Sequence, residues 1–159
     1  MVDIENYIIT RLEEAIHAEY PNAVVLGDLL EELAEFPTVT VNEIQNETLR
    51  RMQDDEPVEH YARVTYEVNI YTNLRYGRKE EAKSILGIID SVMFPMKFVR
   101  RSTRRLPDVD HSRTIYRLYA RYSAVVDEGT VTAGPVGATG ATGETGETVE
   151  TITYHTYRG

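Results

Sequence analysis

Residues 60–73, "HYARVTYEVNIYTN", form the stretch of sequence that decides the fold. Apolar and polar residues alternate along it, which is the pattern of a β-strand with one face in a hydrophobic core. β-Branched and aromatic residues dominate the segment, and both classes favour strands. The apolar face consists of Ala62, Val64, Tyr66, Val68 and Ile70, and the opposite face carries Arg63, Thr65, Glu67 and Asn69.

Two segments with helical periodicity flank this strand. Residues 3–20 and residues 77–94 each carry an apolar stripe with the spacing of one helix face. Asp3 can cap the first helix, and Pro21 and Pro95 follow the two predicted ends. The first stripe is Ile4, Ile8, Leu12 and Ile16, and the second is Ala82, Ile85, Leu86, Ile89 and Met93.

Four further segments are rich in β-branched or aromatic residues and are predicted to be strands. They are residues 23–27, 37–46, 97–105 and 114–126. In the last of them, one face carries Tyr116, Leu118, Ala120, Tyr122, Ala124 and Val126, and the other carries Ile115, Arg117, Tyr119, Arg121 and Ser123. Residues 28–36 are expected to form one or two helical turns, and the polar residues 46–59 a loop.

This order of elements predicts an α+β fold. Strands separated by one long helix and followed by a closing strand pair favour one mostly antiparallel sheet, with both long helices packed on one of its faces. The predicted domain covers residues 1–128. Residues 129–159 are predicted to be a separate, extended C-terminal arm.

The arm contains glycine at every third position, which is the pattern of collagen because only glycine fits at the axis of a triple helix. Three interpretations stay open: a short triple helix, a flexible Gly/Thr tail, or an arm that packs along a neighbouring protein. The alternating segment "TVETITYHTY" suits strand addition to another sheet. The collagen-like glycines are Gly134, Gly137, Gly140, Gly143 and Gly146.

Charge is unevenly spread along the chain. The net charge is −9, yet residues 1–60 carry 15 acidic and 3 basic side chains, whereas residues 61–128 carry 8 acidic and 13 basic ones. Such a split is typical of a dipolar monomer or of a subunit with two complementary surfaces. The longest apolar runs are too short to cross a membrane, so we expect no membrane contact.

The basic segment "RRSTRR" is the most distinctive charged feature. It is either a solvated strand face or a surface that meets phosphates or an acidic neighbour. The negative net charge argues against nucleic-acid binding as the main role, so we favour a contact between copies of the chain. The predicted interface pairs a basic set, Arg100, Arg101, Arg104 and Arg105, which Arg113, Arg117 and Arg121 can join, with an acidic set, Glu43, Asp54, Asp55 and Glu56.

Few residues point to catalysis or metal binding. Glu14 and His17 are three positions apart on the first helix, but di-iron bundles need such a pair twice. Asp108 and His111 lie where a turn between two strands is expected. The sequence has no cysteine, no Gly-rich phosphate loop and no nucleophile elbow. We therefore expect a non-enzymatic protein with no catalytic residue, no metal and no other cofactor.

The order of these segments resembles the phage tail terminator family and its relatives among tail-completion and head–tail joining proteins. The resemblance covers residues 1–128. It is carried by "FPTVTVNEIQN", "ARVTYEVNIYTN", "GRKEEAKSILGIIDSVM" and "MKFVRRSTRRLPDVDHSRTIYRLYARYSAVVD". The collagen-like arm departs from the compact subunit that is usual in that family.

The resemblance implies a structural protein of the virion. Proteins of this family form rings, usually of six copies, that cap the tail tube and join it to the neck, and DNA passes through the lumen. The implied partners are further copies of the chain, the tail tube protein and neck or connector proteins. The implied location is the tail–neck junction of a virion assembled in the host cytoplasm. Two alternatives remain: a head–tail connector or tail-completion protein, and a collagen-tipped module for fibre anchoring or adhesion.

Overall fold

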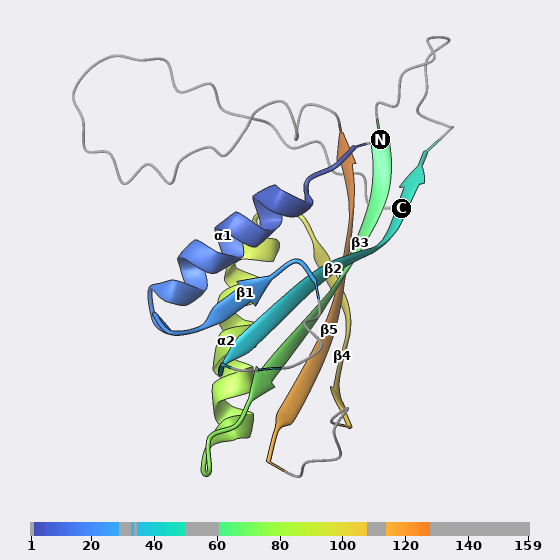
Figure 1. Ribbon diagram of the computed structural model, residues 1–159. Helices are drawn as coiled ribbons and strands as arrows, with labels where there is room; N and C mark the ends of the chain where they lie inside the picture. The colour runs from blue at the N-terminus through green and yellow to red at the C-terminus, as the bar shows by residue number, and fades with distance from the viewer. Residues whose placement is uncertain (1, 29–32, 34, 50–60, 108–113, 128–159) are drawn as a thin grey trace, which may run out of the picture.

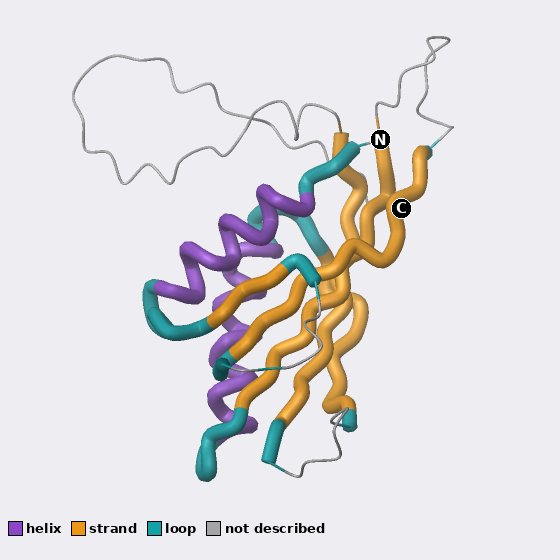
Figure 2. Tube along the Cα trace, in the orientation of Figure 1, coloured by secondary structure: helices purple, strands orange, loops and turns teal. Residues whose placement is uncertain are grey.

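The computed structural model describes residues 2–28, 33, 35–49, 61–107 and 114–127. Within these residues the chain forms two helices and one five-stranded sheet (Figures 1 and 2). In chain order, the elements are α1 (Glu5–His17), β1 (Val24–Leu26), β2 (Thr38–Thr48), β3 (Tyr61–Thr72), α2 (Arg78–Met93), β4 (Val99–Leu106) and β5 (Tyr116–Asp127).

The strands lie in the order β1-β2-β3-β5-β4. The short strand β1 is parallel to β2, and the other three pairs are antiparallel. The predicted α+β class with a mostly antiparallel sheet is therefore confirmed. β3 lies at the centre, where it pairs along its whole length with β5 and along nearly all of it with β2.

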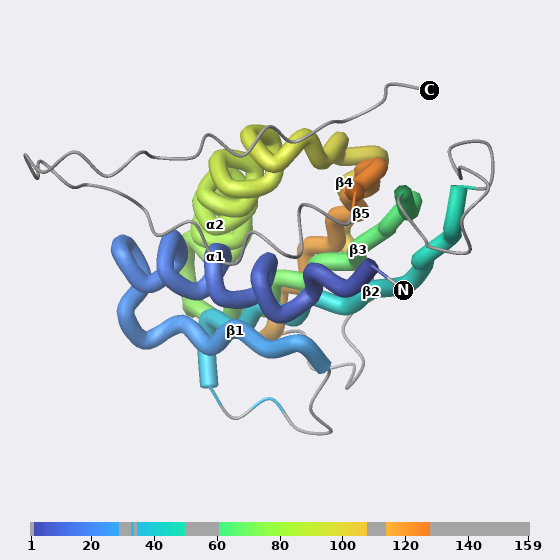
Figure 3. Tube along the Cα trace, turned by 90° about the horizontal axis from the view of Figure 1, so that it is seen from above, coloured from blue at the N-terminus to red at the C-terminus, as the bar shows by residue number. Residues whose placement is uncertain are grey.

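Both helices lie on the same side of the sheet (Figure 3). The apolar stripe of each helix is buried, as its spacing predicts. The apolar faces predicted for β3 and β5 supply the other half of the core and are also confirmed. The helical core residues are Ile8, Leu12, Ile16, Ala82, Ile85, Leu86, Ile89 and Met93, and the two strands contribute Ala62, Val64, Tyr66, Val68, Ile70, Tyr116, Leu118, Ala120, Tyr122, Ala124 and Val126.

Several predicted boundaries differ from the structure by one to three residues, and one predicted element is not helical where it is described. β2 continues to Thr48, so the predicted loop does not begin at residue 46. The polar end of β2 stays in the sheet because it pairs with β3 beyond a bulge between Glu43 and Gln45. α1 ends at His17, three residues earlier than predicted, because the backbone turns there and His17 Nε2 lies 2.8 Å from Ala23 O. The described residues within 28–36 are not helical, and residues 29–32 and 34 lie outside the description.

A glycine marks the beginning of α2. Gly77 precedes the helix and has φ of 79°, in the left-handed region that residues with a Cβ atom rarely adopt. The Gly77 carbonyl accepts a hydrogen bond of 2.9 Å from the amide of Glu81. The chain can therefore turn sharply from β3 into a helix that packs back on the sheet.

Deletion of residues 129–159 is expected to leave the domain folded. The core residues of the described part all lie between Val2 and Val126, so the truncated chain keeps every one of them. The circular dichroism spectrum should keep its helix and sheet signals, and the melting temperature should change by no more than a few degrees. A large loss of either signal on truncation would show that the arm belongs to the core.

Candidate functional site

The sheet has one face that no described helix covers, called here the open face. Residues directly opposite each other on paired strands share a face, so the register defines its membership. From β3 and β5, the open face receives Arg63, Thr65, Glu67, Asn69, Tyr71, Arg117, Tyr119, Arg121 and Ser123. Figure 3 shows α1 and α2 together on the other side of the sheet.

The predicted basic set does not lie on one face. Arg100 pairs with Tyr122 and Arg105 with Leu118, which places both arginines on the helix-covered side. Arg104 pairs with Tyr119 on the open face. A register shift between Arg100 and Ser102 interrupts the alternation, and Arg101 also reaches the open face, where its Nε donates a hydrogen bond of 2.7 Å to Ser123 Oγ.

Arg117 and Arg121 of β5 share the open face with Arg101 and Arg104 only, and not with the whole predicted basic set. We call these four side chains the arginine surface. Arg117 donates through Nε and Nη2 to Asn69 Oδ1, at 3.0 and 2.9 Å. Arg121 Nε donates to the Tyr119 hydroxyl at 2.9 Å. Neutral acceptors thus orient both guanidinium groups.

Aromatic rings lie under these arginines. The Arg104 guanidinium carbon lies 5.1 Å from the centroid of the Tyr119 ring, and that of Arg117 lies 5.4 Å from the centroid of the Tyr71 ring. Cation–π attraction of this kind contributes about 0.5–1 kcal/mol at exposed sites. The two rings therefore help to fix the arginines without neutralising them.

No acidic side chain forms an ion pair with the arginine surface in the part of the chain that the structure describes. Glu67 is opposite Arg121 in the register, but its Oε1 accepts a hydrogen bond of 3.3 Å from Asn69 Nδ2. The open face therefore presents positive charge, although the whole chain is acidic.

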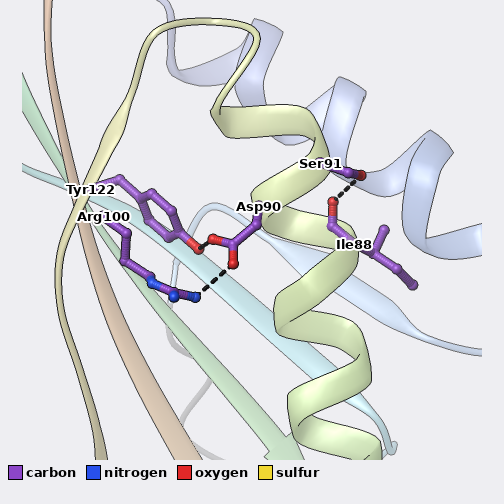
Figure 4. Close-up of polar contacts among 5 residues, drawn as sticks. All are labelled: Ile88, Asp90, Ser91, Arg100 and Tyr122. Carbon is purple, nitrogen blue, oxygen red and sulfur yellow. Dashed lines mark hydrogen bonds and ion pairs between the residues drawn. The ribbon is translucent and has the colours of Figure 1, made fainter.

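Arg100 has a structural partner on the opposite side of the sheet. Its Nη1 donates to Asp90 Oδ2 at 2.6 Å, and the Tyr122 hydroxyl donates to Asp90 Oδ1 at 2.7 Å (Figure 4). One carboxylate of α2 thus holds the edge strand β4 and the inner strand β5. This intramolecular role sets Arg100 apart from the arginine surface.

A second tyrosine–carboxylate contact holds the other side of the core. The Tyr66 hydroxyl donates to Glu43 Oε2 at 2.9 Å. Asn46 Nδ2 donates to Glu43 Oε1 at 3.2 Å and to Val2 O at 2.8 Å. Glu43, predicted as part of an acidic interface, therefore has intramolecular partners on the helix-covered face of β2.

The rest of the predicted acidic set, Asp54, Asp55 and Glu56, lies outside the described residues, as do Arg113 and the five collagen-like glycines. An acidic surface that the sequence reading did not single out is nevertheless visible. It lies on α1 and beside its ends, where Asp3, Glu13, Glu14 and Glu19 are exposed. One basic side chain lies beside it, because Arg11 Nη1 forms an exposed ion pair of 3.4 Å with Glu14 Oε2, and such a pair contributes only about 0–1 kcal/mol. The period of the helix could have identified this acidic surface, because Glu13 and Glu14 lie opposite the apolar stripe.

The described residues contain no cluster of three or more metal-binding side chains. None of the described helices is long and apolar enough to cross a membrane.

A comparison with known protein families and with curated proteins finds no match to this chain. The arginine surface is the candidate functional site that the geometry favours, because its guanidinium groups are oriented by neutral oxygens and aromatic rings on one face of the sheet. Its chemistry is the recognition of carboxylate or phosphate groups.

The two buried tyrosine hydroxyls predict how stability depends on alkaline pH. Burial raises the pKa of Tyr66 and of Tyr122 above the usual tyrosine value, and the nearby carboxylates of Glu43 and Asp90 raise it further. The unfolded chain loses these protons near pH 10, whereas the folded chain keeps them. The stabilisation is therefore complete below about pH 10 and is lost as the pH rises above it.

A Tyr66→Phe/Tyr122→Phe variant removes these two groups. Below about pH 9 it should be less stable than the parent by about 3–6 kcal/mol, because two hydrogen bonds to carboxylates are lost. Above about pH 10 its free energy of unfolding should fall less steeply with pH than that of the parent. Urea denaturation between about pH 8 and 11.5 measures both effects. The exposed Tyr76→Phe is the control, and equal slopes in parent and double variant would contradict the assignment.

Proposed function

We propose that this protein is a structural component of a phage particle, a tail terminator whose copies form a ring that caps the tail tube and joins it to the neck. The observation that carries the proposal is the arginine surface, whose four guanidinium groups have no acidic partner among the described residues. A charged surface that the fold leaves without counter-charges is suited to a partner.

The distribution of charge favours another copy of the chain as that partner. Acidic side chains concentrate in residues 1–60 and basic ones in residues 61–128. Two different surfaces that complement each other give a heterologous, head-to-tail contact, and such contacts form rings when the rotation closes. The resemblance of residues 1–128 to tail terminators supports the same conclusion.

The polar groups of the described residues support a structural rather than an enzymatic role. Asp90 contacts Arg100 and Tyr122, and His17 lies within hydrogen-bond distance of Ala23 O. These contacts join secondary-structure elements. The proposed partners are further copies of the chain, the tail tube protein and neck proteins, with DNA passing through the lumen, and the proposed place is the tail–neck junction of the virion.

The Gly-X-Y repeat favours one function from another class, which is a collagen-tipped module that anchors a fibre. Gly134, Gly137, Gly140, Gly143 and Gly146 would then form a triple helix with two other chains. The tail terminator predicts a ring, whereas the fibre-anchoring module predicts a trimer.

A connector or tail-completion protein of the neck would also form a ring. Binding of the ring to assembled tails distinguishes the tail terminator from these neck proteins.

The purified chain should form rings with an open centre, about six copies each, in negative-stain electron microscopy and multi-angle light scattering. Because screening shortens from about 10 Å at 0.1 M salt to about 3 Å at 1 M, the rings should dissociate more readily at high salt. Incubation with tails that lack their terminator should give capped tails of uniform length. Elongated trimers would support the fibre module, and a monomer at all concentrations would contradict both functions.

A further inference from the structure

We propose that the arginine surface of one copy docks on the acidic outer face of α1 in a second copy. This inference rests on the proposed ring assembly and identifies the contact that builds it. The sequence alone pointed to the segment Arg100–Arg105 and to the acidic loop, whereas the structure favours a different pair of surfaces: Arg101, Arg104, Arg117 and Arg121 on one side, and Asp3, Glu13, Glu14 and Glu19 on the other.

The arginine side of the contact is already oriented in the single subunit. Arg101 and Arg121 each use Nε to hold a neutral oxygen, on Ser123 and on Tyr119. Their terminal amino groups have no partner among the described residues. A guanidinium presents five donors in a fixed plane and binds carboxylates with two parallel hydrogen bonds. These side chains can therefore receive carboxylates with little further loss of rotamer freedom.

The acidic side of the contact lies on the opposite layer of the same subunit. The apolar face of α1 packs into the core through Ile8, Leu12 and Ile16, whereas Glu13 and Glu14 are exposed on the side away from the sheet. Figure 3 shows α1 on the side of the sheet that is remote from the open face. The two surfaces cannot meet within one copy, and the contact is therefore intermolecular and head-to-tail.

The burial of the aromatic rings favours a protein partner over a nucleic acid. Proteins that bind single strands through a sheet stack bases on exposed aromatic rings. On this open face Tyr71 is 1% exposed and Tyr119 is 3% exposed, under the arginines. Base stacking on these rings is excluded without displacement of the arginines. The negative net charge of the chain further disfavours a polyanion.

The test uses the full chain with charge reversals on each surface. Arg104→Glu/Arg121→Glu changes two exposed residues of the arginine surface, and Glu13→Arg/Glu14→Arg changes two exposed residues of α1. Each variant alone should remain monomeric at concentrations where the parent assembles, with association at least about tenfold weaker, because attraction becomes repulsion at two or more pairs. Circular dichroism checks that both variants are folded.

Mixing the two variants is the decisive measurement. The reversed sheet face of one variant then meets the reversed α1 of the other, and the two unmodified surfaces also meet. An equimolar mixture should therefore recover oligomers in light scattering, and so should one chain that carries all four substitutions. Lys79→Glu/Lys83→Glu is the control, because it makes the same change of charge on exposed positions of α2 and should leave assembly unchanged.

Several outcomes would overturn the inference while the proposed function survives. One is a parent that forms rings and an arginine-reversed variant that forms them equally well. Another is rescue of the arginine-reversed variant by Asp54→Lys/Asp55→Lys but not by the α1 reversal, which would assign the contact to the acidic loop. A third is binding of a labelled oligonucleotide that the arginine reversal abolishes. A parent that never assembles would instead contradict both proposals.

Discussion

The pairing of β3 with a strand on each side is the constraint on which the rest of the structure depends. β3 has no free edge, because β2 pairs with one side of it and β5 with the other. The alternation of apolar and polar residues along β3 separates its two faces. Every apolar side chain from Ala62 to Ile70 enters the core, and the polar ones turn to the open face. A slip of one residue would exchange the two sets, so the register fixes the core and the candidate site together.

Two large tyrosines occupy the centre of the core because carboxylates satisfy their hydroxyl groups. Tyr66 and Tyr122 are opposite each other on β3 and β5, and a buried hydroxyl without a partner would be destabilising. Glu43 and Asp90 approach from different elements, β2 and α2, and each also holds a third group. The same contacts give Glu43 and Arg100 partners within the subunit, although Arg100 stays exposed.

The sequence predicted what depends on periodicity and missed what depends on contacts between distant residues. The faces of β3 and β5 and the stripes of both helices follow from local spacing, so their predictions are confirmed. The distribution of the arginines of β4 between the two faces of the sheet could not be predicted from local spacing, because the bulge beside Arg101 leaves no signal in the sequence. The contact of Glu43 with Tyr66 was not foreseen because the two residues are 23 positions apart in the sequence. The end of β2 was missed because Asn46, Glu47 and Thr48 are polar, yet their backbone pairs with β3.

The positions of the arginines also affect which surface of the sheet is suited to contact with another chain. β4 is an edge strand, and an exposed edge invites pairing with any other strand. Its charged side chains and its bulge disfavour that pairing, and the contact of Arg100 with Asp90 holds the strand on α2. Arg101 and Arg104 meanwhile extend the charge of β5 across the open face. Edge-to-edge association is thus opposed, whereas the contact that we propose, between the open face and α1 of another copy, uses one defined surface. A closed ring needs such a surface, because closure requires one contact repeated with one geometry.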